Sequence, residues 1–176
     1  MAYIDLPKLE DMPARIQEQA RPLLAKTGQL GEIFRLLAVK EEVFFATDRM
    51  AQAYLLTETE LPFATKERIA LLVSLENNCK MCVGVHQGIA RTLGMSEAQV
   101  AEVLDGVDGI QCDDREKALL RFCIRAAAKD NYKLLQADID AIKAQGWSDT
   151  ELLEAVAVTA YFNYINTLSN VFGLGY

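Results

Sequence analysis

Two cysteines and the chain's single histidine lie close together in the stretch ENNCKMCVGVH, residues 76–86. Cys79 and Cys82 are three residues apart, so on a helix their sulfurs can meet. At the start of a helix, unpaired backbone N–H groups and the helix dipole stabilise a thiolate. His86, one turn beyond Cys82, can take the thiol proton or, once charged, stabilise the thiolate. The stretch is therefore typical of a reactive cysteine site.

A helical wheel places these side chains on one narrow stripe. At roughly 100° per residue, Cys79, Cys82 and His86 fall on the same side as two apolar residues of the same segment. These are Ile89 and Leu93, which belong in a hydrophobic core. We therefore expect the whole stripe to face the interior, so that both thiols and the imidazole converge on an apolar environment.

Other interpretations of the same residues stay open. A zinc site could combine the two cysteines and the histidine with Glu67, Cys112 or Cys123, although no second CxxC or HxxxH is present. Small core cysteines beside a buried histidine could also coincide by chance. Cys112 and Cys123 have no partner at a redox spacing, so we expect them to be small core residues.

Composition favours one acidic globular domain. The chain has 176 residues, of which 51% are hydrophobic and 24% charged, enough apolar material for a sizeable core. A formal net charge of −7 argues against nucleic acid or an anionic membrane as the main partner. Neither a long apolar run nor a secretory signal pattern is present, and four cysteines are too few for a secreted disulfide framework. We expect a cytoplasmic protein.

The hydrophobic periodicity is helical throughout, and no strand pair is indicated. We expect an all-α single domain, 1–176, with N-terminal helices in 1–60 and a core that carries the cysteine motif in 61–176. No proline follows Pro62, so the later helices run without interruption. The predicted helices cover 31–37, 41–56, a segment N-capped by Thr65, a segment from 77–79 to Leu93 ended by Gly94, 113–130 and 137–146, with two more opened by capping boxes at Ser96–Gln99 and Ser148–Glu151.

The spacing E-x11-C-x2-C-x3-H resembles the signature of the alkyl hydroperoxidase D branch of the carboxymuconolactone decarboxylase family. In this chain the pattern is Glu67, Cys79, Cys82 and His86, and the likeness is strongest over residues 61–93. The resemblance implies a helical fold and a cysteine-based peroxidase that needs no haem, flavin or metal. It also implies that lactone chemistry is absent, because the decarboxylase branch of the family lacks this cysteine pair.

The resemblance also implies a role for each motif residue. Cys82 matches the peroxidatic cysteine, Cys79 the resolving cysteine, and Glu67 and His86 the proton relay. We therefore expect peroxide reduction through a Cys79–Cys82 disulfide, which an external dithiol of the thioredoxin-like or lipoyl type reduces again. Met81 stands where alkyl hydroperoxidase D itself has a second histidine, and methionine cannot pass a proton. The alternatives are a dithiol–disulfide oxidoreductase with weak peroxidase activity and a non-catalytic zinc-binding assembly protein.

We further expect a homo-oligomer, most simply a trimer or hexamer, as the resemblance implies. Gly84 and Gly88 lie on the helix face nearly opposite the cysteines, where they would permit close approach of another helix or subunit. The aromatic run at Tyr161, Phe162 and Tyr164 is typical of a core or a subunit interface.

Overall fold

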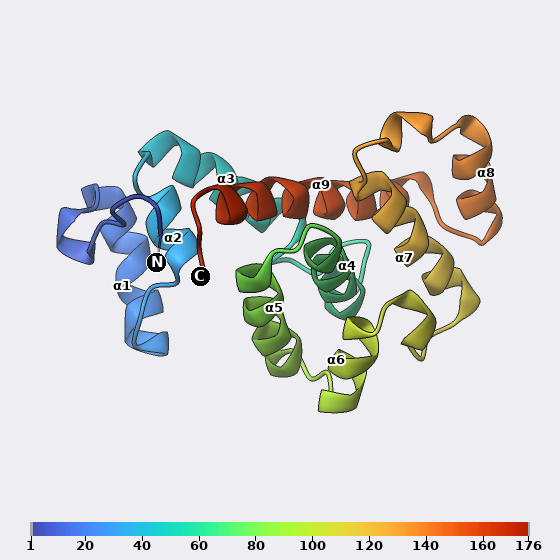
Figure 1. Ribbon diagram of the computed structural model, residues 1–176, viewed down its shortest axis with the longest axis horizontal. Coiled ribbons are helices and arrows are strands. Elements are labelled where there is room, and N and C mark those ends of the chain that lie inside the picture. The colour runs from blue at the N-terminus through green and yellow to red at the C-terminus, as the bar shows by residue number, and fades with distance from the viewer. Residues whose placement is uncertain (1, 176) are drawn as a thin grey trace.

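The structure is a computed structural model that describes residues 2–175 (Figure 1). Over these residues it is all-α, as predicted, with no strand. The long helix α9 crosses the molecule, with α1, α2 and α3 gathered at one end, α7 and α8 at the other, and α4, α5 and α6 along its side (Figure 1). The helices are α1 (Ala14–Thr27), α2 (Glu32–Leu37), α3 (Glu41–Tyr54), α4 (Phe63–Glu76), α5 (Lys80–Thr92), α6 (Glu97–Leu104), α7 (Asp114–Ala127), α8 (Gln136–Ala144) and α9 (Asp149–Val171), with short 3₁₀ turns at Leu9–Asp11, Val107–Gly109 and Asn131–Lys133.

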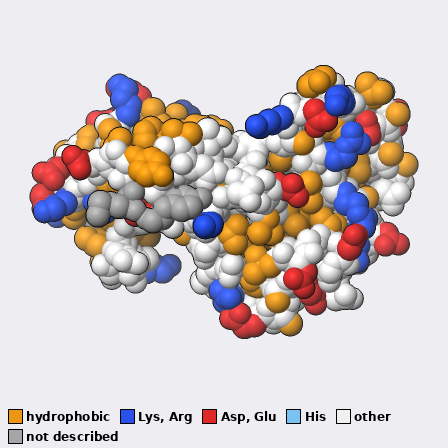
Figure 2. All heavy atoms as spheres, in the orientation of Figure 1, with side chains coloured by type: hydrophobic (Ala, Val, Ile, Leu, Met, Phe, Trp, Pro, Cys, Tyr) orange, Lys and Arg blue, Asp and Glu red, His pale blue; other side chains and the backbone are white. Residues whose placement is uncertain are grey.

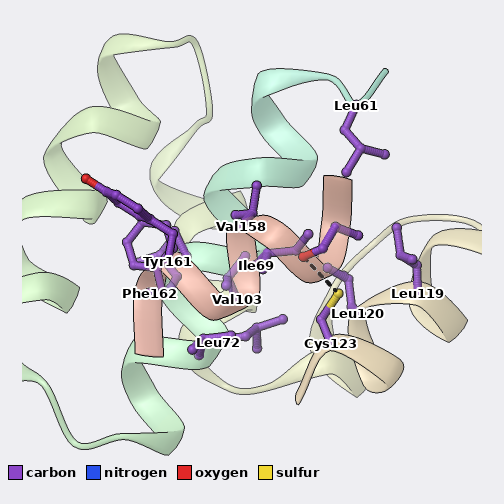
Figure 3. Packing of buried hydrophobic residues seen from close by; sticks show 14 of the residues in the cluster. Leu61, Ile69, Leu72, Val103, Leu119, Leu120, Cys123, Val158, Tyr161 and Phe162 are labelled. Atoms are coloured by element: carbon purple, nitrogen blue, oxygen red, sulfur yellow. Dashed lines mark hydrogen bonds between the residues drawn. The ribbon is translucent and has the colours of Figure 1, made fainter. Parts of the chain in front are cut away.

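Helix α4 forms the centre of the core. It packs against α5, α6, α7 and α9, and residues 69–74 are buried without interruption. A helix enclosed on all sides carries apolar residues all round, which is why IALLV shows no polar face. Figure 3 shows its Ile69 and Leu72 among side chains of α7 and α9, including Leu120, Val158 and Phe162. Within residues 2–175, no helix combines the length and apolar character needed to cross a membrane.

Several predicted helix ends are confirmed. Ser96 and Ser148 each form a capping box, and the Asp113 carboxylate accepts the hydrogen bond of the Glu116 amide at the start of α7. Gly94 follows α5 with a φ of +98°, a left-handed conformation that residues with a side chain rarely adopt.

The prediction that Thr65 N-caps a helix is wrong. Helix α4 begins at Phe63, and Pro62 is its N-cap residue with a φ of −59°. Proline suits this place because its ring fixes a φ close to the helical value and its missing N–H would have no intrahelical acceptor. The Thr65 hydroxyl instead donates to the Glu116 carboxylate of α7 at 2.8 Å, so the residue connects two helices rather than starting one.

The sequence pattern does not predict helix α1, because Pro13 and Pro22 both suggest interruption. Pro13 is the N-cap residue of α1, and Pro22 lies inside the helix. A proline there removes one backbone hydrogen bond, to the carbonyl of Glu18. Pro22 is exposed, so water can satisfy that carbonyl and the helix continues to Thr27.

A buried ion pair fixes the segment that leads into α4. The Lys66 ammonium lies 2.5 Å from the Glu154 carboxylate of α9, and it also donates to the Thr57 carbonyl at 2.6 Å. Glu154 in turn accepts from the Thr59 hydroxyl and from the Glu60 amide, at 2.5 and 2.9 Å. Both charged side chains are buried, so the full set of partners is what makes the pair tolerable away from water.

We predict that Glu154→Gln lowers the free energy of unfolding by about 3–5 kcal/mol near neutral pH, because it leaves the buried Lys66 without a counter-charge. Burial raises the pKa of Glu154, but the hydrogen bonds and charge of Lys66 and the neighbouring donors outweigh it, so the pKa lies below its ordinary value. The ionised glutamate therefore stabilises the fold at any pH above that ordinary pKa. This stabilisation is lost as the pH falls through the pKa that Glu154 has in the folded protein.

Urea unfolding of wild type and variant, measured from neutral pH down to about pH 3, spans the ordinary glutamate pKa and tests this. The difference between the two proteins should be large at neutral pH and shrink in acid. Lys143→Gln, which breaks the exposed ion pair with Asp149, should have a much smaller effect because water screens that pair. A Glu154 variant as stable as wild type at neutral pH would contradict the prediction.

Candidate active site

Cys79 and Cys82 are joined in a disulfide at the start of α5. Their Cα atoms are 5.4 Å apart, a usual separation for a disulfide. Cys79 is the N-cap residue of α5, and its sulfur accepts a hydrogen bond from the Cys82 amide at 3.4 Å. The sulfurs therefore meet at a helix N-terminus, as the spacing predicts, and both residues are almost fully buried.

His86 and Glu67 form a direct pair beside the disulfide. The His86 Nδ1 lies 2.8 Å from a carboxylate oxygen of Glu67, which extends from α4. The Phe162 ring of α9 meets the imidazole edge to face, with the ring centres 4.7 Å apart. A carboxylate that accepts from Nδ1–H fixes the orientation and tautomer of the ring. The imidazole's other nitrogen, Nε2, is then left for proton exchange.

The structure thus brings together the four residues that the motif singles out. Cys82 and His86 are on the same helix one turn apart, and Glu67 reaches His86 from the preceding helix. Helix α4 packs against α5, and Glu67 meets His86 across this contact although the two are 19 residues apart in the chain. The catalytic roles of these residues stay predictions at this stage.

The expected burial of Ile89 and Leu93 is wrong in this chain. Their exposed fractions are 37% and 45%, whereas Cys82 and Ala90 are buried. At roughly 100° per residue, the buried face of α5 is centred near His86, about 60° around the helix from Ile89. Leu93 is the C-cap residue, where the helix ends. Ile89 therefore lies beside the packed face of α5, and Leu93 lies at the end of that face, where the helix stops.

A pocket of about 320 Å³ opens beside Cys79. Cys79 forms part of its wall, whereas Cys82 does not. A ligand in this pocket would therefore lie against Cys79, of which 1% is exposed, and not against Cys82. The other lining residues combine apolar with amide and basic side chains: Ser74, Leu75, Asn78, Lys80, Val83, Gly84 and Gln87.

A network of amide side chains holds the turn between α4 and α5. The Asn77 amide donates to the Asn163 and Asn166 carbonyl oxygens of α9, at 2.7 and 3.0 Å. Asn166 donates to the Ser74 hydroxyl, and Asn170 donates to the Asn77 backbone carbonyl. The network fixes the turn that leads to Cys79, and no motif in the sequence predicts it. Its signal is a set of asparagines at helical spacing inside an otherwise apolar helix.

Met81, between the two cysteines, packs against the C-terminal segment. A Cβ built on Gly175 would lie 2.8 Å from the Met81 Cβ, so only glycine permits this approach. Gly175 also has a φ of +76°, and its amide donates to the Glu32 carboxylate of α2 at 2.7 Å. The position where alkyl hydroperoxidase D has its second histidine is therefore a packing contact in this protein.

The remaining two cysteines lie apart from the disulfide. Cys123 is buried in the core, with its sulfur 3.9 Å from the Ala155 carbonyl (Figure 3), and burial raises the pKa of its thiol to about 12. Burial and the nearby Glu116 carboxylate raise the pKa of Cys112, which is half-buried. Both thiols are thus poor nucleophiles at neutral pH. Over residues 2–175, no three His, Cys, Asp or Glu side chains are arranged to share a metal ion.

Several solved structures have the same fold. A peroxidase-related protein from Ralstonia eutropha JMP134 with an alkylhydroperoxidase AhpD core is 24% identical, with a TM-score of 0.89 over 98% of this chain and 90% of its own. A peroxidase-related protein from Silicibacter sp. TM1040 is 22% identical, with a TM-score of 0.88 and the same coverage, 98% and 90%. The debrominase Bmp8, solved in complex with 2,3,4-tribromopyrrole, is 16% identical, with a TM-score of 0.77. The match covers 99% of this chain and 92% of the Bmp8 chain.

These similarities and the helix arrangement define an all-α protein with the AhpD-like fold and a cysteine pair at the start of a helix. Residues 41–125, which contain all four motif residues, match the carboxymuconolactone decarboxylase family. The predicted resemblance to this family is confirmed over these residues, which are slightly less than half of the chain, and the structural similarity confirms the AhpD-like fold. No curated protein matches the chain.

Proposed function

We propose that this protein is a cysteine-based peroxidase that reduces hydroperoxides through the Cys79–Cys82 disulfide. The observation that carries the proposal is the arrangement of that disulfide one turn before His86, whose imidazole is paired with a buried carboxylate. A thiol pair alone supports disulfide exchange. An adjacent imidazole with a free Nε2 adds proton transfer, which peroxide cleavage requires because the departing alkoxide must be protonated.

The proposed cycle has three steps. The Cys82 thiolate attacks one oxygen of the peroxide, the O–O bond breaks, and the departing alkoxide takes a proton from the imidazolium of His86 to leave as an alcohol. Cys82 is now a sulfenic acid, which the Cys79 thiol attacks to form the disulfide and release water. An external dithiol then reduces the disulfide by thiol exchange and becomes a disulfide itself. Glu67 keeps His86 oriented throughout.

Peroxide consumption by the purified protein with an excess of dithiothreitol tests the proposal. We expect turnover, with one equivalent of peroxide removing two free thiols from the pre-reduced protein. Disulfide exchange without peroxide consumption would instead favour the dithiol–disulfide oxidoreductase. Stoichiometric zinc in freshly purified protein, together with inert thiols, would favour the zinc-binding alternative. Because one fold can carry different reactions, the debrominase among the structural neighbours does not decide between these outcomes.

We further propose that the external dithiol enters the pocket beside Cys79. Cys79 forms part of its wall and Cys82 does not, so we expect an incoming thiolate to attack the Cys79 sulfur and release Cys82 as the thiolate. The volume of about 320 Å³ suits a dithiol on a small or extended group. The thiol that leaves is then the one poised beside His86 for the next peroxide.

Gly84→Leu should slow the reduction of the disulfide by dihydrolipoamide by about tenfold or more, the effect of losing about 1.4 kcal/mol of interaction. Gly84 lines the pocket, and a Cβ added there meets no other atom within 4 Å, so a larger side chain can enter the pocket without disturbing the core. Gly88→Leu is the matched control, since Gly88 is on the same helix, is equally open and lies outside the pocket. Stopped-flow measurement of disulfide reduction distinguishes them. Equal rates of disulfide reduction in both variants would show that the dithiol does not use this pocket.

We also propose that the protein forms a homo-oligomer, a trimer or hexamer, through the exposed side of α5. Val85, Ile89 and Leu93 recur at helical spacing and leave 37–46% of each side chain exposed. Figure 2 shows hydrophobic side chains gathered on one face of the molecule, over the region of α4, α5 and α6. An apolar stripe on a helix that carries the site is a natural subunit contact.

Ile89→Glu should therefore shift the protein towards monomer in light scattering at micromolar concentration. A buried, unpaired carboxylate at a subunit contact opposes association, whereas on a free surface it is harmless. Leu153→Glu is the control, because Leu153 is an exposed leucine on α9, distant in sequence from the stripe. A wild-type monomer, or an Ile89 variant that assembles like wild type, would contradict this interface.

A further inference from the structure

A buried hydroxyl group lies against the sulfur of Cys82. The Ser169 Oγ, on α9, is 3.5 Å from the Cys82 Sγ. Ser169 is 1% exposed and Cys82 is 2% exposed, so neither group meets bulk water. In the disulfide form the hydroxyl lies 2.8 Å from the Ile165 carbonyl, four residues back on the same helix. Nothing in the cysteine motif points to this residue, which is 87 positions beyond Cys82.

The oxidation state of Cys82 decides where the single hydroxyl hydrogen of Ser169 points. A disulfide sulfur is a weak acceptor, so the hydrogen is better placed on the Ile165 carbonyl. A thiolate carries a full negative charge and accepts a much stronger, charge-assisted bond. Because Oγ already lies within reach of the sulfur, only the O–H bond has to turn. Helix geometry assigns the Ser169 backbone N–H to the Ile165 carbonyl, so that carbonyl keeps a partner.

We propose that Ser169 donates its hydroxyl hydrogen to the Cys82 thiolate in the reduced protein and returns it to the Ile165 carbonyl when the disulfide forms. The proposal rests on the proposed function only in that the cycle passes through a Cys82 thiolate. It makes Ser169 a further group in contact with a reacting atom, one supplied by the C-terminal helix.

A thiolate at this buried place requires several stabilising partners, since burial alone disfavours the charged form. On α5 these are the helix N-terminus and His86, whereas Lys80 in the first turn lies about 160° around the helix from Cys82. On α4 the nearby carboxylate, Glu67, acts through His86. On α6, Glu97 is paired with Arg91 at the other end of α5. Residues 165–170 of α9 carry no charge, so Ser169 supplies a neutral donor from that side.

Thr159 provides a matched control for Ser169. Its hydroxyl lies on the same helix, is equally buried, and donates to the carbonyl four residues back, Ala155, at 2.9 Å. It faces Cys123 instead of Cys82. Removing either hydroxyl therefore has a similar cost in helix packing, but only one removal takes a donor from the Cys82 sulfur.

The test measures iodoacetamide alkylation of Cys82 across pH in a Cys79→Ser background, with mass spectrometry to identify the modified residue. Adding Ser169→Ala should raise the apparent pKa of Cys82 by about one to two units, the equivalent of one hydrogen bond to a charged group. Adding Thr159→Ala should leave it unchanged. An unchanged pKa with Ser169→Ala, or an equal shift in both variants, would overturn the proposal.

A second pair of variants tests the proposal even if the Ser169→Ala variant does not fold. Ser169→Thr and Ser169→Val have nearly the same shape and differ in the hydroxyl group, so circular dichroism should show equal helicity while only the valine variant shows the raised pKa. The alkylation experiment involves no peroxide. If the protein lacked peroxidase activity but Ser169→Ala gave the predicted pKa shift, the proposed function would be refuted and the role of Ser169 would stand. If the protein were an active peroxidase but Ser169→Ala gave no pKa shift, the role of Ser169 would be refuted and the proposed function would stand.

Discussion

After one equivalent of peroxide, a Cys79→Ser variant should carry a dimedone-trapped sulfenic acid on Cys82, and a Cys82→Ser variant should carry none. Cys82 is one turn from His86, whose Nε2 is free to move a proton, so it is the thiol expected to meet peroxide. Without Cys79 there is no partner to condense with, so the reaction should stop after one oxidation. Steady-state peroxide turnover should fall to background in both variants.

The structure makes these two variants informative. Serine is among the preferred N-cap residues, so Cys79→Ser keeps an acceptor for the Cys82 amide and α5 should still begin in the same place. Mass spectrometry after dimedone treatment reads the result directly. Cys112→Ala and Cys123→Ala are the controls and should retain turnover, because both thiols are separate from the disulfide and have raised pKa values.

Two outcomes would change the assignment. An adduct on Cys79 in the Cys82→Ser variant, with none on Cys82 in the other, would reverse the roles of the two cysteines. Lost turnover in a folded Cys112 or Cys123 variant would mean that a third thiol takes part. Mass spectra show the first result, and the turnover assay shows the second.

The local part of the site could be predicted from the sequence because it lies on one helix. Cys79, Cys82 and His86 span two turns of α5, so their spacing alone places them near one another. The capping boxes at Ser96 and Ser148 are similarly local, and both are confirmed. Signals that act within one or two helical turns survive the formation of tertiary structure, which is why these predictions were correct.

The rest of the site depends on contacts between distant segments. Ser169 contacts Cys82, 87 residues away in the sequence, and Asn77 contacts Asn166, 89 residues away. A pattern within one helix does not show which distant residue a side chain will contact. The prediction that Ile89 is buried was wrong for the same reason, because its burial depends on contacts with distant segments. A wheel gives the relative angles of side chains on a helix, but the packing of α4 and α9 against α5 decides which side faces inward. Glu67 was predicted as a site residue from the family resemblance, because its own position in the sequence gives no such indication.

Glu67→Gln should slow the single-turnover reaction of the reduced protein with peroxide, and His86→Ala should slow it by about 100-fold or more, the usual contribution of a positioned general acid or base. Removing the imidazole takes away both the proton donor for the departing alkoxide and the charge that favours the Cys82 thiolate. Replacing Glu67 by glutamine keeps an oxygen that can accept from Nδ1–H but removes the negative charge that stabilises a protonated ring.

Stopped-flow peroxide reduction and iodoacetamide alkylation of Cys82, both across pH, separate these effects. His86→Ala should raise the apparent pKa of Cys82 and slow both reactions at pH 7. Glu67→Gln should slow peroxide reduction more than alkylation, because alkylation needs a thiolate but no proton donor for a leaving group. Arg91→Ala, which removes the more exposed ion pair with Glu97 at the end of the same helix, is the control and should change neither. If His86→Ala left the pKa of Cys82 unchanged, the helix N-terminus would set its thiolate character without His86. If the rate of peroxide reduction were also unchanged, His86 would be a core residue held by Glu67, and the proton for the alkoxide would have to come from water.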